Sequence, residues 1–325
     1  MTGPTQSFDP NAPDILLYEH FWRVQKQFLA RQRKAFEEVE TLYHYTTAEG
    51  FKSILDGREF WATHIAHLND SSELEYGLTL LKDRLGVLEA VRPNEYVRLF
   101  VERAREQFRH AAVMLFRAYV VCFCENGNLL SQWRGYASGG GGYSIGLSRH
   151  LESPILSNGE ANLIEKHGLV QLRKILYDGS EQTRLLDELL IGLVPIFEQY
   201  GAIMHRERFR VEIVDNAVMQ LQTVLADLLP CFKNPSFREE QEWRYVYFAE
   251  RHPVPNERFR IRNGSFVPYI PLRLLDSENG PLRVAQAFCG PTLNPELAIW
   301  TVHELAGSLG YTNVDVRPSG IPLRF

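Results

Sequence analysis

Short strand-like segments and long helical segments follow one another in this chain without a regular order, and this pattern restricts the fold more than any other feature of the sequence. The most strand-like segment is AYVVCFCE at 118–125, a continuous apolar run of the kind that forms a buried strand. No internal repeat and no regular strand–helix–strand cadence is visible. We therefore expect an α+β fold in which helical insertions interrupt a sheet.

Apolar residues at helical spacing predict a helix over 14–40, so residues 1–40 are expected to form a tail and a packing helix. Residues 41–325 are expected to form a single α+β domain, with helical insertions at about 82–117 and 182–230. Further strands are predicted at 41–46, 58–65, 143–147, 242–250, 266–272, 284–290 and 313–319.

The charge and the cysteine content argue against several classes of protein. With 35 basic and 40 acidic residues the net charge is −5, which argues against bulk binding of nucleic acid. Four cysteines are too few for a secreted disulfide scaffold. Residues 1–14 lack the pattern of a signal peptide, and no apolar run is long enough to cross a membrane, so we expect a cytoplasmic protein.

A histidine, His44, lies near the end of the predicted strand 41–46, shortly before a predicted helix. A histidine at a strand end could exchange hydrogen bonds with a ligand hydroxyl, and its charge could change near neutral pH. The alternative is a half-buried histidine that the backbone satisfies. Apart from an isolated HxxH at His64 and His67, the histidines lack the spacing of metal ligands, so we expect no metal site.

Ser131, Trp133 and Tyr143 flank a run of glycines at 139–142. Glycines allow a ligand to approach the backbone, and aromatic rings can stack on a planar ligand. The run lacks the lysine of a P-loop and leads into a strand, which excludes that phosphate-binding motif. The structural alternative is a hairpin loop beside a buried tryptophan.

Two carboxylates and an arginine are expected on one face of the strand near 242, because Glu240, Glu242 and Arg244 alternate along it. Two like charges raise the pKa of one carboxyl unless the arginine neutralises them. The cluster could be catalytic, or it could be an ion-paired strand end. Asp70 and Glu73, in contrast, are explained by a capping box at the start of a helix.

Four stretches of the chain resemble DUF family 2971, a bacterial family of domains of unknown function. They are LYHYTTAEGFKSILDGREFWATHIAHLND, CFCENGNLLSQWRGYASGGGGYSIGL, FKNPSFREEQEWRYVY and VDVRPSGIPLRF. The resemblance covers about residues 41–325, and the family name supplies no activity.

A second resemblance is to the ADP-ribosyltransferase superfamily. A strand ending in histidine, a helix closing with ILDG, a central aromatic strand and a late strand glutamate are similar to its split β-sheet. This implies NAD as substrate, without a metal. His44 would bind the adenosine-side ribose, and Tyr143 would stack on nicotinamide. Glu242 or Glu240 would hold the other ribose hydroxyl and stabilise the oxocarbenium-like transition state. The same site would include Tyr45, Thr46, Ser131, Trp133 and Arg244.

Such an enzyme could act as an intracellular toxin or a phage-defence effector, on an acceptor that the sequence does not identify. Two other functions stay open. One is a non-enzymatic module that senses a nucleotide or binds a protein. The other is a metal-independent nuclease that uses His44 and Glu242 as acid and base.

Overall fold

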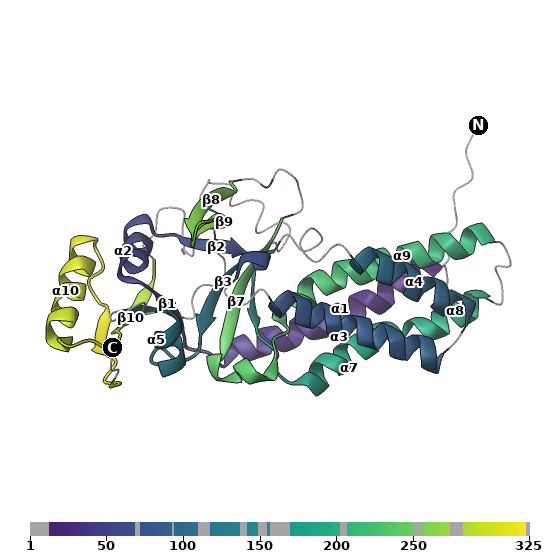
Figure 1. Cartoon of the computed structure of the whole chain (residues 1–325), viewed down its shortest axis with the longest axis horizontal. Coiled ribbons are helices and arrows are strands. Elements are labelled where there is room, and N and C mark those ends of the chain that lie inside the picture. Colours follow the sequence, from purple (N-terminus) through teal and green to yellow (C-terminus); the bar gives the residue numbers. More distant parts are fainter. Residues whose placement is uncertain are drawn as a thin grey trace. The chain divides into compact units, whose positions relative to one another are not determined.

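The computed structural model describes residues 13–68, 72–92, 94–109, 118–136, 142–148, 155–156, 170–201, 207–249, 254, 256–273 and 282–322. The chain divides into two compact units (Figure 1). A helical unit comprises 1–32, 72–116 and 176–234, and a sheet unit comprises 33–71, 117–175 and 235–325. The sequence led us to expect one domain over 41–325. In the structure, nearly all of both predicted insertions falls in the helical unit, together with most of the first helix.

The helical unit contains most of α1 (Pro13–Glu37), α3 (Ser72–Val91), α4 (Glu95–Arg109), α7 (Gly179–Ile191), α8 (Leu193–Gly201), α9 (Glu207–Leu228) and the short 3-10 helix η2 (Leu229–Cys231). The buried residues of α1 recur at helical spacing, as Leu17, Phe21, Val24 and Phe28. The insertion expected at 82–117 is interrupted, because Asn94 accepts a hydrogen bond from Val97 N (2.8 Å) and starts α4 as a separate helix.

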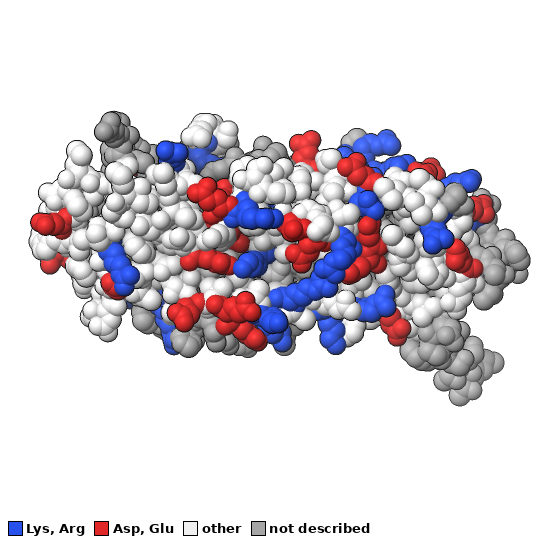
Figure 2. Space-filling view, turned by 90° about the horizontal axis from the view of Figure 1, so that it is seen from below, with Lys and Arg blue, Asp and Glu red and all other residues white. Residues whose placement is uncertain are grey.

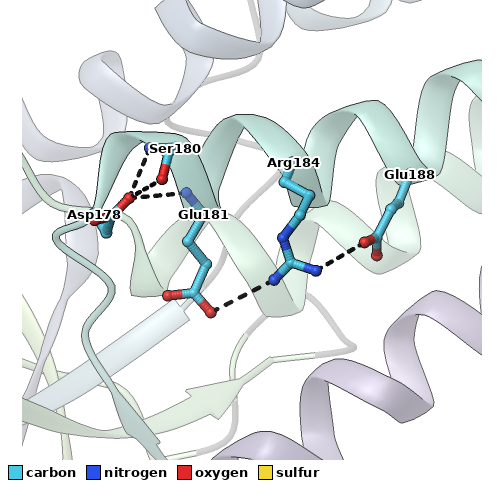
Figure 3. A network of polar contacts seen from close by, with 5 residues as sticks. All are labelled: Asp178, Ser180, Glu181, Arg184 and Glu188. Atoms are coloured by element: carbon cyan, nitrogen blue, oxygen red, sulfur yellow. Dashed lines mark hydrogen bonds and ion pairs between the residues drawn. The ribbon is translucent and has the colours of Figure 1, made fainter.

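Polar contacts stabilise the first turns of α7 (Figure 3). Asp178 Oδ1 accepts hydrogen bonds from Ser180 N (2.8 Å) and Glu181 N (3.0 Å), which satisfies two amides at the start of the helix. One turn later, Arg184 lies 4.0 Å from Glu181 and 3.0 Å from Glu188. Contacts at these spacings stabilise a helix locally, so α7 begins at a well-defined residue.

The sheet unit contains eleven described strands and five helical segments (Figure 1). The strands are β1 (Thr41–Thr46), β2 (Phe60–His64), β3 (Ala118–Cys124), β4 (Tyr143–Ser148), β5 (Ile155–Leu156), β6 (Val170–Lys174), β7 (Glu242–Phe248), β8 (Arg258–Arg262), β9 (Ser265–Arg273), β10 (Val284–Cys289) and β11 (Asp315–Pro318). The helical segments are α2 (Ala48–Gly57), η1 (Ile65–His67), α5 (Leu130–Tyr136), η3 (Pro235–Glu240) and α10 (Pro295–Ser308). The ladders between these strands are antiparallel except for the parallel pair β10–β11, and the sheet is open. The expectation of a fold that mixes helices with a sheet is confirmed.

Strand β3 joins the two halves of the sheet. Along one edge it pairs with β7 over its whole length, ending at Cys124 opposite Glu242. Along its other edge it pairs with β1 at Cys124 and with β2 at Tyr119 and Val120. From there β1 continues into β4, β10 and β11, whereas β2 continues into β9 and its partners β5 and β8. The two halves thus diverge from β3 between Val120 and Cys124, and we call this part of the β3 edge the split.

The two faces of the sheet differ in what they bury. Paired residues of an antiparallel ladder share a face and successive residues alternate, so the register assigns each side chain. One face, which we call the core face, packs Phe123 and Tyr245 with residues of α2 and α10 in the main hydrophobic cluster. The other carries Cys124 opposite Glu242, and we call it the Glu242 face. Cys124 there belongs to a smaller cluster with Tyr45 and Trp133.

Hydrogen bonds hold the loop that follows β3. The Tyr45 hydroxyl donates to Asn126 O and accepts from Leu129 N, both at 2.8 Å. Trp133 Nε1 donates to Asn128 Oδ1 (2.9 Å), and Asn128 Nδ2 donates to Ser319 O (2.7 Å). The residues after β11 are therefore tied to the loop that leads into α5.

The sequence patterns did not predict every strand of the sheet. β5, β6 and β8 were not predicted, and β8 alternates arginine with apolar residues that stay exposed. Most of the glycine run at 139–142, and the side chains of the capping box at Asp70 and Glu73, lie outside the described residues.

Charges of both signs are mixed on the face of the molecule shown in Figure 2. Lysine and arginine side chains lie among aspartate and glutamate side chains there, in keeping with the nearly balanced composition. Among the helices that the structure describes, none combines the length and the apolar character of a membrane span.

We expect Trp133→Ala to lower the free energy of unfolding by about 3–5 kcal/mol, because the indole is fully buried and donates a hydrogen bond to Asn128. Equilibrium unfolding in denaturant measures this loss. Trp300→Ala, at a position of α10 that is 60% exposed, is the matched control and should change stability by less than about 0.5 kcal/mol. Equal losses in the two variants would contradict the structural role of Trp133.

Candidate functional site

His44 lies at the split. Its Nδ1 is 2.9 Å from Cys122 O, a carbonyl that lies between the points where β1 and β2 pair with β3. Its ring packs against Phe60 of β2, at a centroid distance of 5.1 Å, and against Phe123 of β3, at 5.7 Å. A side chain of β1 therefore takes the place of backbone pairing where the two strands diverge from β3.

This contact decides the protonation of His44. A carbonyl oxygen only accepts hydrogen bonds, so Nδ1 carries the hydrogen and Nε2 of the neutral ring keeps its lone pair. Burial lowers the pKa of His44 to about 4; the bond to Cys122 O opposes this shift and the positive charge of Arg260 adds to it. The residue nevertheless keeps some contact with solvent. At neutral pH His44 is thus a neutral hydrogen-bond acceptor at Nε2.

A buried ion pair lies on the Glu242 face. Nε and Nη2 of Arg244 donate to the two carboxylate oxygens of Glu242 at 2.7 and 2.9 Å. Both side chains are almost completely buried, and the buried Arg173 of β6 lies opposite Arg244 in the ladder. Removal of charges from water is costly unless they are paired, and the two-point contact fixes the orientation of the carboxylate.

Glu240 does not continue the strand face of Glu242, and that prediction from the sequence was wrong. The 3-10 helix η3 ends at Glu240, Gln241 adopts the left-handed backbone region with φ of 44°, and β7 begins only at Glu242. This kink removes Glu240 from the alternation of the strand. Both carboxylates nevertheless act on Cys124, whose pKa is raised to about 12 mainly by burial and further by neighbouring negative charges.

The register separates His44 from Glu242, two of the three residues proposed as catalytic. Glu242 pairs with Cys124 and Cys124 pairs with Tyr43, so these three side chains share the Glu242 face. His44 follows Tyr43 in β1, and its ring packs against the core-face residue Phe123. The backbones of Glu242 and Tyr43 are two strand spacings apart, about 10 Å. His44 and Glu242 thus lie on different faces of the sheet. A ligand that contacts both therefore has to pass from one face to the other beside β3, at the split.

Tyr143 and Thr46 are not brought together with Glu242. The two residues pair across β4 and β1, in register with His44 on the core face. The ring of Tyr143 packs against Phe51 of α2 at 4.9 Å, and burial raises the pKa of its hydroxyl. Tyr143 thus lies on the opposite face of the sheet from Glu242, although the resemblance implies that both residues contact the nicotinamide half of NAD.

Tyr45, Trp133 and Ser131 lie on the side of Glu242 but make structural contacts. The rings of Tyr45 and Trp133 meet edge to face at 4.7 Å, and burial strongly raises the pKa of the Tyr45 hydroxyl. Ser131 Oγ donates to Glu239 Oε1 (3.1 Å) and so links α5 to η3. These contacts position the loop after β3 beside the Glu242–Arg244 pair.

An aromatic and cationic cluster beside the split was not predicted. Thr63 pairs with Val120 and with Tyr269, which places Thr63, Tyr269 and, by alternation, Trp61 on the Glu242 face. Trp61 stacks on Tyr269, with centroids 4.5 Å apart and planes at 26°. Arg260 of β8 donates from Nη2 to Thr63 Oγ1 (2.7 Å). The sequence signal was the alternation RFRIR followed by Asn-Gly, which is typical of a β-hairpin.

Within the described ranges, no three His, Cys, Asp or Glu side chains are grouped as a metal site would require. The rings of His64 and His67 are 5.8 Å apart. His64 Nδ1 accepts a hydrogen bond from Ala66 N (3.2 Å), so this nitrogen is used by the backbone.

The lowered pKa of His44 predicts a loss of stability in acid. The unfolded chain binds a proton at a pKa near 6.5, whereas the folded protein resists it down to about 4, so stability should fall as the pH drops through this interval. At about pH 4.5 this difference in proton binding should lower the free energy of unfolding by roughly 2–3 kcal/mol relative to neutral pH. His44→Asn keeps a donor near the position of Nδ1 and does not titrate. Urea unfolding of both proteins between about pH 7 and 4.5 should show the smaller loss for the variant; parallel curves would argue against the assignment.

Removal of one member of the buried ion pair should be more damaging than removal of both. Arg244→Met leaves the Glu242 carboxylate buried without its two-point partner, and we expect a loss of about 3–5 kcal/mol in unfolding free energy. The double variant Glu242→Leu, Arg244→Met should recover much of this loss. A double variant that is less stable than the single one would show that the charges, rather than the packing, maintain this part of the face.

Comparison with known proteins adds one match. Residues 132–245 match a family model described as "Protein of unknown function (DUF2971)". The matched segment includes Trp133, Tyr143, Glu242 and Arg244, whereas His44 precedes it. No curated protein and no solved structure matches the chain. Of the resemblance expected over about 41–325, the comparisons therefore support similarity to this family of unknown function over residues 132–245.

Proposed function

We propose that the chain binds NAD at the split of its sheet and transfers the ADP-ribose group to an acceptor. The observation that carries this proposal is the divergence of β1 and β2 from one edge of β3, with His44 at the point of divergence. The backbone of a fixed carboxylate, Glu242, lies about two strand spacings from that of Tyr43, and its side chain is on the opposite face of the sheet from His44. A ligand with two ribose groups suits two polar positions separated in this way.

His44 would bind one ribose. Its Nε2 carries a lone pair at neutral pH, because Nδ1 donates to Cys122 O and the pKa of the ring is lowered to about 4. A ribose hydroxyl would donate a hydrogen bond to this nitrogen. The same property argues against the nuclease alternative, since a neutral ring without a hydrogen at Nε2 has no proton to give to a leaving group there.

Glu242 would stabilise the transition state. The bond between ribose C1′ and the nicotinamide nitrogen breaks, its electron pair leaves with nicotinamide, and positive charge develops on the ribose. A nucleophile on the acceptor then bonds to C1′ and loses its proton. An ionised carboxylate accepts hydrogen bonds from hydroxyl groups, so a ribose hydroxyl would donate to Glu242. Burial strengthens its interaction with the developing charge.

The stacking role that the resemblance implies for Tyr143 is not part of this proposal, because its ring packs against Phe51 on the core face. Glu240 remains a second candidate for the carboxylate, since it is less buried than Glu242 and also acts on Cys124.

Release of nicotinamide from NAD tests the proposal. We expect the wild type to release nicotinamide, with water or a component of a cell lysate as acceptor. Glu242→Gln should slow this release about 100-fold or more, as is usual when one electrostatic stabiliser is removed. Glu240→Gln should have a smaller effect. Glu304→Gln, at an exposed position of α10, is the control for charge removal and should match the wild type.

Thermal unfolding of each variant is measured in parallel, because Glu242→Gln also weakens the ion pair with Arg244. A folded wild type that releases no nicotinamide, with or without lysate, rules out the transferase. Binding of NAD without its cleavage would instead favour the nucleotide-sensing module, and the engagement of Glu242 by Arg244 is the observation that favours this alternative.

A further inference from the structure

We propose that the cluster of Trp61, Tyr269, Arg258 and Arg260 binds the adenylate half of the dinucleotide, with the base on Trp61 and the diphosphate at the arginines. This inference rests on the proposed function, and it names side chains that neither the sequence patterns nor the resemblance singled out. The chemical class that the cluster would recognise is a planar base joined to a diphosphate.

Trp61 provides a surface for stacking. Its side chain is 41% exposed although its neighbours in β2, Phe60 and Ala62, are buried on the core face. Tyr269 is buried and stacks on the indole at 4.5 Å, so it fixes the plane of the ring. A large aromatic ring that is held in place on one side and exposed on the other is suited to stack on a base.

Two arginines lie beside this surface, and Trp61 Nε1 donates to Glu59 Oε1 at 3.4 Å. The Arg260 guanidinium lies 5.6 Å from the centre of the Trp61 ring and 5.9 Å from that of Tyr269. Nη2 of Arg260 donates to Thr63 Oγ1, whereas its Nε has no hydrogen-bond partner within the described part of the chain. Arg258, two residues earlier on the same face of β8, has a side chain that is 55% exposed, and its one ion pair among those described is the loose contact with Glu59 at 3.9 Å.

The local charge suits an anion. Residues 258–273 contain four arginines and no acidic residue, although the whole chain has a net charge of −5. The turn of this hairpin is formed by Asn263 and Gly264, both with positive φ, so β8 and β9 are held in a fixed register. Guanidinium groups on a rigid hairpin can bind phosphate oxygens through charge-assisted hydrogen bonds.

The cluster is continuous with the split. Arg260 contacts Thr63, which pairs with Val120 at the start of the split, and its charge is felt by His44. A base on Trp61 and a diphosphate at Arg258 and Arg260 would therefore leave the adjoining ribose near His44. The nicotinamide end would then extend toward Glu242. This order follows the strands from β2 across β3 to β7.

Binding of ADP, ADP-ribose and nicotinamide mononucleotide tests this inference, because the last ligand lacks the adenylate half. We expect Trp61→Ala to weaken binding of ADP and ADP-ribose about tenfold and to leave binding of nicotinamide mononucleotide unchanged. Trp61→Phe should retain most of the affinity. Arg258→Ala should weaken ADP but not adenosine. Trp300→Ala removes a tryptophan that is 60% exposed in α10 and is the matched control. Calorimetric titration measures each affinity.

The outcomes separate this inference from the proposed function. If the wild type releases nicotinamide from NAD but Trp61→Ala binds ADP-ribose as tightly as Trp300→Ala does, the adenylate site is wrong and the transferase stands. If Trp61→Ala and Arg258→Ala weaken ADP as expected while the wild type does not cleave NAD, the adenylate site stands and the transferase is wrong. A folded wild type that binds neither ADP nor ADP-ribose overturns the adenylate site.

Discussion

The hydrogen bond between His44 and Cys122 O reflects the constraint on which the sheet unit depends. One edge of β3 serves two strands, β1 and β2, and these strands cannot both pair along its whole length. Backbone groups inside a protein need partners, so the place where the strands diverge requires a substitute for the missing ladder. The imidazole of His44 supplies it, and the rings of Phe60 and Phe123 pack against it.

From this arrangement follow the two faces of the sheet and their different chemistry. The core face is filled by apolar residues together with α2 and α10. The Glu242 face combines the smaller Trp133 cluster, the buried Glu242–Arg244 pair and the Trp61 cluster beside the split. Charged groups are retained in a buried position on this face at a cost in desolvation, which is a common property of functional sites and also of structural ion pairs. In the proposed NAD site, Glu242 also interacts with the ligand. In the alternative, the Glu242–Arg244 pair only stabilises the fold.

Much of the fold could be predicted from patterns within single segments. The apolar run of β3, the helical spacing in α1 and the strand that contains Glu242 were all evident, because these signals repeat within a few residues. The site was less predictable. Glu240 left the strand because Gln241 adopts a left-handed backbone, and Trp61 contacts Tyr269 and Arg260, which are about 200 residues away.

The sequence by itself determined which residues alternate on each strand and which types of side chain were available for chemistry. Alternation cannot say which faces of two different strands coincide, because a shift of one residue in register moves every side chain to the other face. Only the tertiary structure placed Tyr143 against Phe51 on the core face, Glu242 with Arg244 on the opposite face, and His44 on the core face at the split. The register depends on pairing between strands that are far apart in the sequence. Burial of a whole sheet selects one register, whereas local preference does not.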